Sequence, residues 1–266
     1  MTGLIVSSLR AGYGGAPVLQ NVSFQLENGR IMGVLGANGS GKTTLLKAIC
    51  GILPHEGSCL LGGTPLEGLT ARRMALQCSY IPQRSGISID VSALDVVLMG
   101  FNPQLRLLQP PDAAMRRRAA DALAQVGLGD RLEENYLHLS EGQKQLCILA
   151  RTLVSPGSLL LMDEPESSLD FQHRYRLLQI IRQRVREEGR MALISLHDPA
   201  LALNCCDDLL LIKDGTAAGL LRPAADSTDT MAALLSQIYG PVTLTVCHDR
   251  QGRSHIVMLK EQEDAP

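Results

Sequence analysis

The stretch Gly36-Ala37-Asn38-Gly39-Ser40-Gly41-Lys42-Thr43 decides the fold of this chain, because it has the composition of a phosphate-binding loop. It follows the apolar run Ile31–Leu35, which has the length of a buried strand, and it precedes residues 44–50, which we expect to form a helix ending at Gly51. Glycines let the backbone wrap tightly, so that several N–H groups and the positive end of the helix point at one anion. A chance glycine-rich turn would not require this strand and helix.

Each polar residue of the loop has an expected task. Lys42 would carry a positive charge to the outer phosphates of a nucleotide, and the hydroxyl of Thr43 would bind Mg²⁺. The other nucleotide contacts are expected from Gly36, Asn38, Gly39, Ser40, Gly41 and Thr44.

A pair of carboxylates follows a second apolar run. Residues 159–162 are continuously apolar and lead directly into Asp163-Glu164. In a nucleotide-hydrolysing site, Asp163 would hold Mg²⁺ through water and Glu164 would polarise the attacking water. The alternative is a local role as a helix N-cap or turn carboxylate.

Composition excludes some classes of function. Among the 266 residues aromatics are 3%, Trp is absent and the net charge is −2, so stacking and electrostatic attraction to nucleic acid are both weak. No apolar run is long enough to span a membrane, and the N-terminus does not read as a signal peptide. We therefore expect no nucleic-acid partner.

The seven cysteines give no pattern of a disulfide framework or a zinc site, because they are odd in number and never spaced as CxxC. Most lie in apolar segments, where cysteine packs as a small hydrophobic residue. The sequence reads as that of a reduced, cytosolic protein.

Strand-like and helical segments alternate along the chain, which predicts an α/β fold with a mainly parallel sheet and the active site at the carboxyl ends of its strands. Residues 4–10 and 18–27 alternate apolar and polar residues, as in an N-terminal antiparallel β subdomain. Residues 85–155 are expected to form a helical subdomain within a single domain of residues 1–240. Residues 241–266 would form a short β-hairpin tail.

A family resemblance rests on Leu139-Ser140-Glu141-Gly142-Gln143, which resembles the LSGGQ signature of the ATP-binding cassette (ABC) ATPases. Other marks of that family follow in order. Tyr13 resembles the aromatic residue that stacks on adenine, Gln83 the Q-loop glutamine, Asp170 the D-loop aspartate and His197 the switch histidine. The resemblance covers residues 4 to about 220. Taken singly, Tyr13 or His197 could be a packing residue and Asp170 a helix cap.

The resemblance implies a P-loop NTPase core that works as a homodimer, with each ATP held between one P-loop and the signature helix of the partner. Ser140, Gly142 and Gln143 would then contact nucleotide bound by the other copy, together with Asp170. Glu164, His197 and Gln83 would be catalytic, and Thr43, Gln83 and Asp163 would hold Mg²⁺. Glu141 departs from the usual glycine, and we expect its side chain to point away from the nucleotide.

Two further segments resemble the ATPases of iron-siderophore, haem and cobalamin importers. These are residues 95–100, with the sequence DVVLMG, and residues 196–202, with the sequence LHDPALA. The resemblance implies a peripheral subunit on the cytoplasmic face of the membrane, docked on a separate permease and acting indirectly with an external binding protein. The alternatives are a soluble ABC ATPase of iron–sulfur assembly, an importer of another small solute, and, much less compatible with the signature, a kinase.

Overall fold

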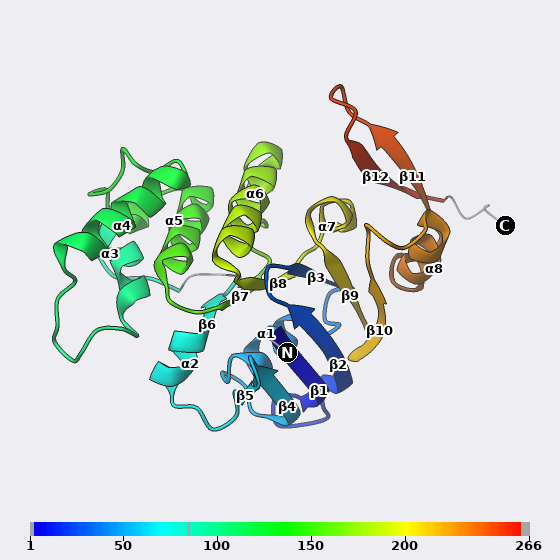
Figure 1. The fold of residues 1–266 in the computed structure, drawn as a ribbon, viewed down its shortest axis with the longest axis horizontal. Coiled ribbons are helices and arrows are strands. Elements are labelled where there is room, and N and C mark those ends of the chain that lie inside the picture. Colours follow the sequence, from blue (N-terminus) through cyan, green and yellow to red (C-terminus); the bar gives the residue numbers. More distant parts are fainter. Residues whose placement is uncertain (1–2, 84–85, 262–266) are drawn as a thin grey trace.

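The structure is a computed structural model that describes residues 3–83 and 86–261. Its centre is a six-stranded sheet in the order β10-β9-β3-β8-β7-β6 (Figure 1). All neighbouring strands in it are parallel except β10, which pairs antiparallel with β9 at one edge. The strands are β3 (Ile31–Leu35), β6 (Cys78–Ile81), β7 (Leu159–Asp163), β8 (Met191–Ser195), β9 (Asp208–Lys213) and β10 (Thr216–Leu221).

A second, antiparallel sheet lies beside the nucleotide-loop helix α1 (Lys42–Ile49), in the order β2-β1-β4-β5. The chain enters this sheet at its N-terminus and returns to it directly after α1. Its strands are β1 (Gly3–Ala11), β2 (Leu19–Glu27), β4 (His55–Leu61) and β5 (Thr64–Pro65).

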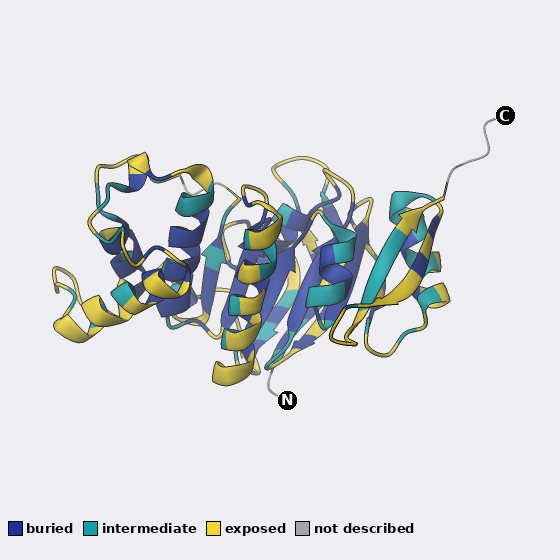
Figure 2. Ribbon diagram, turned by 90° about the horizontal axis from the view of Figure 1, so that it is seen from above, coloured by how far each residue is buried: buried dark blue, intermediate teal, exposed yellow. Residues whose placement is uncertain are grey.

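Alternate residues of the central strands supply two hydrophobic cores, one on each face of the sheet. Ile31 and Leu35 of β3 pack with the helices on one side, whereas Met32 and Val34 pack with α1 and the antiparallel sheet on the other. Figure 2 shows the central strands buried and α6 (Phe171–Glu188) with a solvent-exposed outer face. A strand covered on both faces reads as a continuous apolar run, which explains the sequence of β3, β7 and β8.

A helical region projects from one end of the central sheet (Figure 1). The connecting helix α2 (Ala71–Gln77) precedes β6, and the other helices of the region follow β6. The region contains α3 (Ala93–Leu98), the 3₁₀ turn Met99–Phe101, α4 (Ala113–Gln125), the 3₁₀ turn Tyr136–His138 and α5 (Glu141–Val154).

The C-terminal part lies at the opposite end of the molecule (Figure 1). Helix α8 (Thr228–Tyr239) leads into the hairpin of β11 (Val242–His248) and β12 (Ser254–Lys260). Asn204 of α7 (Pro199–Cys205) joins the hairpin to the core, because its side chain exchanges two hydrogen bonds with the backbone of Ile256, at 2.8 and 2.9 Å.

The fold class expected from the sequence is confirmed: an α/β core with a mostly parallel sheet, an antiparallel β subdomain and helices. The pattern of residues does not predict α2, α7, α8 or β10, and α1 begins at Lys42, two residues before the expected helix. All seven cysteines are free thiols. In the part of the chain that the structure describes, no helix is long and apolar enough to cross a membrane.

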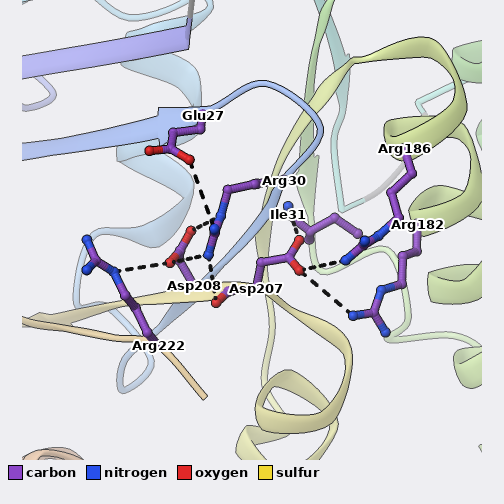
Figure 3. A network of polar contacts seen from close by, with 8 residues as sticks. All are labelled: Glu27, Arg30, Ile31, Arg182, Arg186, Asp207, Asp208 and Arg222. Carbon is purple, nitrogen blue, oxygen red and sulfur yellow. Dashed lines mark hydrogen bonds and ion pairs between the residues drawn. The ribbon is translucent and has the colours of Figure 1, made fainter. Parts of the chain in front are cut away.

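A polar network clamps the amino-terminal ends of β3 and β9 (Figure 3). Arg30 donates two hydrogen bonds of 2.9 Å to the carboxylate of Asp208, whose side chain is 9% exposed. The neighbouring Asp207 accepts from the backbone N–H of Ile31 at 2.9 Å and pairs with Arg186 of α6 at 3.0 Å. The two carboxylates thus tie α6 to both strands, at the end of the sheet opposite the nucleotide loop.

Removing the Asp208 carboxylate should destabilise the fold, because it leaves the partly buried Arg30 without its bidentate partner. We expect Asp208→Ala to lower the free energy of unfolding by about 1–3 kcal/mol, measured by urea denaturation. The control is Glu56→Ala, whose ion pair with Arg10 is long, at 3.6 Å, and solvent-exposed on both sides. Exposed pairs contribute about 0–1 kcal/mol, so equal losses in the two variants would contradict a stabilising role for the network.

Candidate functional site

The loop of residues 36–43, here called the nucleotide loop, leaves the first N–H groups of α1 available to bind an anion. Its N-cap residue, Gly41, has φ of 110° and makes no side-chain cap hydrogen bond, so the cap residue itself does not occupy these donors. Gly36 lies against β9, where a Cβ atom would stand 2.4 Å from the carbonyl oxygen of Ile212. Ser40 Oγ is buried and, among the described residues, has no hydrogen-bond partner. The loop therefore has the backbone geometry and the unpaired donors of a phosphate site.

Lys42 lies folded over the loop. Its ammonium donates to the carbonyl oxygens of Gly36 at 2.9 Å and Ala37 at 3.2 Å, and the residue is 5% exposed. Burial lowers the pKa of Lys42, against the opposing effect of the nearby Glu164 and Asp163 carboxylates. A triphosphate would replace carbonyl oxygens with charged acceptors for this ammonium group.

Thr43, Asp163 and Ser195 form a chain of hydrogen bonds below the loop. Thr43 Oγ1 donates to Asp163 Oδ1 at 3.1 Å, and Ser195 Oγ donates to the same oxygen at 2.7 Å. Asp163 and Ser195 pair directly in the parallel register of β7 and β8, which places both side chains at the carboxyl end of the sheet. Hydroxyl and carboxylate oxygens are the ligands that Mg²⁺ prefers, so Thr43 and Asp163 fit this ion.

Glu164 occupies a strained backbone position. Its φ is 50°, in the left-handed region that non-glycine residues rarely adopt, and its N–H donates to Ser195 Oγ at 3.0 Å. One carboxylate oxygen, Oε2, lies 2.6 Å from His197 Nε2 and also accepts from the side-chain amide of Gln83. The structure thus brings the three predicted catalytic residues together at one oxygen atom.

Two residues of this cluster were not expected from the sequence: Ser195 and Glu166. Glu166 is 2% exposed, and its Oε1 accepts the backbone N–H of His197 at 3.2 Å. Burial raises its pKa, and the neighbouring Glu164 carboxylate adds to this shift against the N–H donors. The sequence signal for Glu166 is a third acidic residue two positions after Glu164, and the signal for Ser195 is a hydroxyl residue at the end of an apolar strand.

A pocket joins the loop to this cluster. Its lining includes most of the predicted nucleotide residues and all three predicted catalytic residues. Tyr13, which is 59% exposed, lies at its rim, and Lys47 Nζ stands 5.8 Å from the centre of its ring. The lining residues are Tyr13, Val18, Asn38, Gly39, Gly41, Lys42, Thr43, Thr44, Gln83, Glu164 and His197.

Seven predicted residues are not part of this lining. Gly36, Ser40 and Asp163 belong to the loop and to the end of β7 beside it, whereas Ser140, Gly142, Gln143 and Asp170 belong to other segments. Ser140 and Gln143 form a reciprocal capping box at the start of α5, and Asp170 caps α6. Gly142 lies close to the segment before α6, since a Cβ atom there would stand 3.3 Å from the carbonyl oxygen of Ser168. The signature and D-loop segments therefore meet on one surface, separate from the pocket.

Glu141 lies in the first turn of α5 with its side chain 78% exposed, and its carboxylate pairs with Lys144 at 2.8 Å. An acidic residue in this turn is favoured by the helix dipole. The structure thus gives Glu141 a local partner, and the expectation that its side chain points away from the nucleotide stays a prediction.

The sequence profile of the ABC transporter family matches residues 19–167. This chain belongs to the ABC transporter family. It is 39% identical over 226 residues to the hemin import ATP-binding protein HmuV of Bordetella pertussis, covering 82% of this chain and 85% of that protein. It is 31% identical to the cobalamin import ATP-binding protein BtuD of Halobacterium salinarum, covering 93% of this chain and 64% of that protein.

The fold is also that of solved ABC structures. A metal-chelate type ABC transporter in an inward-facing conformation superimposes with a TM-score of 0.81 at 24% identity, over 98% of this chain and 99% of that one. As a member of this family, the ABC ATPase described here binds and hydrolyses ATP. The resemblance seen in the sequence is confirmed.

Two substitutions separate nucleotide binding from hydrolysis. Lys42→Ala should lose ATP binding, because the buried ammonium over the loop disappears. Glu164→Gln should keep binding and lower phosphate release by about 10²-fold or more, as expected when a general base is removed. Fluorescent-nucleotide binding and phosphate release measure the two effects, with Glu133→Gln on an exposed residue as the control. Hydrolysis by Glu164→Gln at the parental rate would remove Glu164 from the catalytic role.

Glu166→Gln tests the buried carboxylate through stability. A carboxyl whose pKa is raised on folding destabilises the folded state once pH exceeds its unfolded value, near 4.5, and this cost remains above its folded pKa. We expect Glu166→Gln to gain stability relative to the parent as pH rises from about 4 to about 8, followed by thermal melts. Glu133→Gln is again the control, and a difference that stays constant with pH would contradict the raised pKa.

Proposed function

We propose that this chain is the ATP-hydrolysing subunit of an ABC importer that takes up haem or a related metal chelate through a separate membrane permease. One observation carries the proposal: the relatives that align over most of the chain are named for hemin and cobalamin import. Iron-siderophore chelates belong to the same proposed substrate class, because segments 95–100 and 196–202 resemble the ATPases of all three uptake systems.

In the proposed reaction, Mg²⁺ would be held by Thr43, Asp163 and Gln83 and would neutralise charge on the outer phosphates. Lys42 and the N–H groups of the loop bind the same phosphates, and Tyr13 stacks on the adenine. Glu164 orients and polarises the attacking water. His197, 2.6 Å from Glu164, holds that carboxylate in place and reaches toward the outermost phosphate.

The active form is proposed to be a homodimer. Ser140, Gly142, Gln143 and Asp170 lie on a surface apart from the pocket, so they can act on nucleotide only if they meet the pocket of another copy. The exposed N-terminus of α5 would then face the phosphates bound by the partner, with its helix dipole favourable to negative charge. Two sites would form together at one interface.

The proposed location is the cytoplasmic face of the cell membrane, where the homodimer docks on the permease. A binding protein outside the membrane would act on the ATPase indirectly, through that permease. The alternative functions are a soluble ABC ATPase of iron–sulfur cluster assembly and an importer ATPase for another small solute.

Reconstitution with the permease tests the proposal. The ATPase is expressed with a candidate permease and purified from membranes, and the complex is placed in liposomes with a binding protein for the same chelate. We expect phosphate release to rise several-fold when hemin is loaded, and Glu164→Gln to abolish both the stimulation and the uptake. Cobalamin and a ferric siderophore, tested in parallel, identify the member of the chelate class.

Other outcomes point to the alternatives. Copurification with soluble scaffold proteins alone would contradict the importer and favour iron–sulfur assembly. Stimulation by a substrate that is not a metal chelate would keep the importer and contradict the substrate class.

A further inference from the structure

Three residues of different chemistry converge in the antiparallel sheet, away from the nucleotide pocket. His55 and Cys59 lie on β4, four residues apart and therefore on the same face of the strand. Glu67 follows β5, and its segment is held against β4 by a hydrogen bond of 2.9 Å from Leu66 N–H to the carbonyl oxygen of Cys59. The imidazole, thiol and carboxylate of these residues all point at one place.

The distances within this cluster match a metal-binding geometry. His55 Nε2 lies 3.3 Å from Glu67 Oε1 and 3.7 Å from Cys59 Sγ, and the three ligand atoms all lie within 4.8 Å of one another. Tetrahedral Zn²⁺ with usual bond lengths separates nitrogen and oxygen ligands by roughly 3.4 Å, and nitrogen and sulfur ligands by roughly 3.6 Å. A single ion could therefore contact all three atoms with small adjustments.

Hydrogen bonding alone satisfies this cluster poorly. His55 Nε2 faces both the carboxylate and the thiol, yet it carries at most one proton and can act as donor or acceptor, but not as both at once. A cation accepts electron pairs from all three groups together. With a thiolate, a carboxylate and a neutral imidazole, a divalent ion would form a site without net charge, which lowers the cost of burying it.

The surroundings also suit a bound ion. The Cys59 residue is fully buried and the His55 side chain is 7% exposed, whereas the Glu67 side chain is 35% exposed and leaves a way in from solvent. The backbone N–H of Cys59 donates to Glu67 Oε1, which orients the carboxylate from a second direction. Such outer hydrogen bonds hold metal ligands in position.

From this convergence we propose that His55, Cys59 and Glu67 form a site for a divalent transition-metal ion of the Zn²⁺ class, separate from the Mg²⁺ of the nucleotide pocket. A mixed nitrogen, sulfur and oxygen set favours Zn²⁺ over the hard ions Mg²⁺ and Ca²⁺. Solvent would take the fourth position on the Glu67 side. The bound ion would tie β4 to the segment after β5, and β4 pairs with β1 at Ala11, two residues before Tyr13.

Binding requires loss of the thiol proton. Burial raises the pKa of Cys59 to about 12, with a further contribution from Glu67, so the free protein holds a neutral thiol. Burial also opposes ionisation of Glu67, but backbone N–H donors and His55 outweigh it and lower the pKa of that carboxyl. The balanced step is therefore Cys59–SH and Zn²⁺ giving a Cys59 thiolate–Zn²⁺ bond and one proton, which passes to the buffer.

The test uses the full chain, freed of metal with a chelator and studied without nucleotide. We expect one equivalent of Zn²⁺ to bind, to raise the melting temperature and to release one proton, measured as the dependence of the calorimetric heat on the buffer. Co²⁺ as the probe should give a thiolate-to-metal charge-transfer band. Cys59→Ser should abolish that band, and Glu67→Gln should weaken Zn²⁺ binding by at least about tenfold.

Cys247→Ser is the matched control, since Cys247 is an exposed cysteine on the hairpin and lies outside the cluster. It should leave the charge-transfer band and the affinity unchanged. Glu67→Gln keeps a side-chain oxygen that can accept a hydrogen bond from Cys59 N–H, so the local fold should be preserved. Weaker Zn²⁺ binding by this variant would therefore report the loss of the carboxylate and not unfolding. A band that survives Cys59→Ser, a band lost in Cys247→Ser, or a wild-type chain that binds no equivalent of Zn²⁺ would each overturn the proposal.

Discussion

The parallel register of β3, β8 and β7 is the constraint on which the site depends. Val34 pairs with Ser195, and Ser195 pairs with Asp163. The loop after β3, the Asp-Glu pair at the end of β7 and His197 after β8 therefore lie at the same edge of the sheet. A slip of one residue would turn every side chain of a strand to the opposite face and exchange its partners between the two cores. Hydrophobic packing on both faces thus sets the positions of the polar groups to within hydrogen-bond distance.

This packing also explains how the strain at Glu164 is tolerated. A left-handed φ at a non-glycine residue costs of order 1–3 kcal/mol and persists only where the surroundings hold it. Here the N–H of Glu164 is fixed by Ser195, whose hydroxyl donates in turn to Asp163. The strained turn directs the Glu164 carboxylate toward Gln83 and His197. The neighbouring Asp163 carboxylate instead accepts hydrogen bonds from Thr43 and Ser195.

Much of the core was predictable because its signals are local. Ile31–Leu35 and residues 159–162 are apolar runs that the structure forms as β3 and β7, and the helix expected at residues 44–50 corresponds to α1 (Lys42–Ile49). By contrast, α7 and α8 are short or weakly patterned. The position of α7 depends on a partner distant in sequence, because its Asn204 bonds to Ile256 of the C-terminal hairpin. Of the site, the motif residues were found, whereas Ser195 and Glu166 acquire meaning only once β7 and β8 lie side by side.

The same distinction applies to the cysteines. Spacing rules for zinc sites detect ligands that are close in sequence, and no CxxC pair exists in this chain. His55, Cys59 and Glu67 meet because β4 turns back through β5, a hairpin that the spacing of the cysteines does not indicate. The absence of a CxxC pair therefore argues only against metal sites whose ligands are neighbours in sequence. It does not argue against a site whose ligands a turn brings together.

The division of the predicted nucleotide residues between two surfaces has a physical consequence. Charges that stabilise a transition state act strongly where water is excluded, and weakly where a bound phosphate remains hydrated. The loop of one copy presents its donors in an open pocket with Tyr13 exposed at the rim. Closure over the phosphates needs a second surface that offers donors and excludes water, and the N-terminus of α5 has that chemistry. Hydrolysis would then be tied to the approach of two chains, which is how a nucleotide site can exert force on a partner that never contacts the nucleotide.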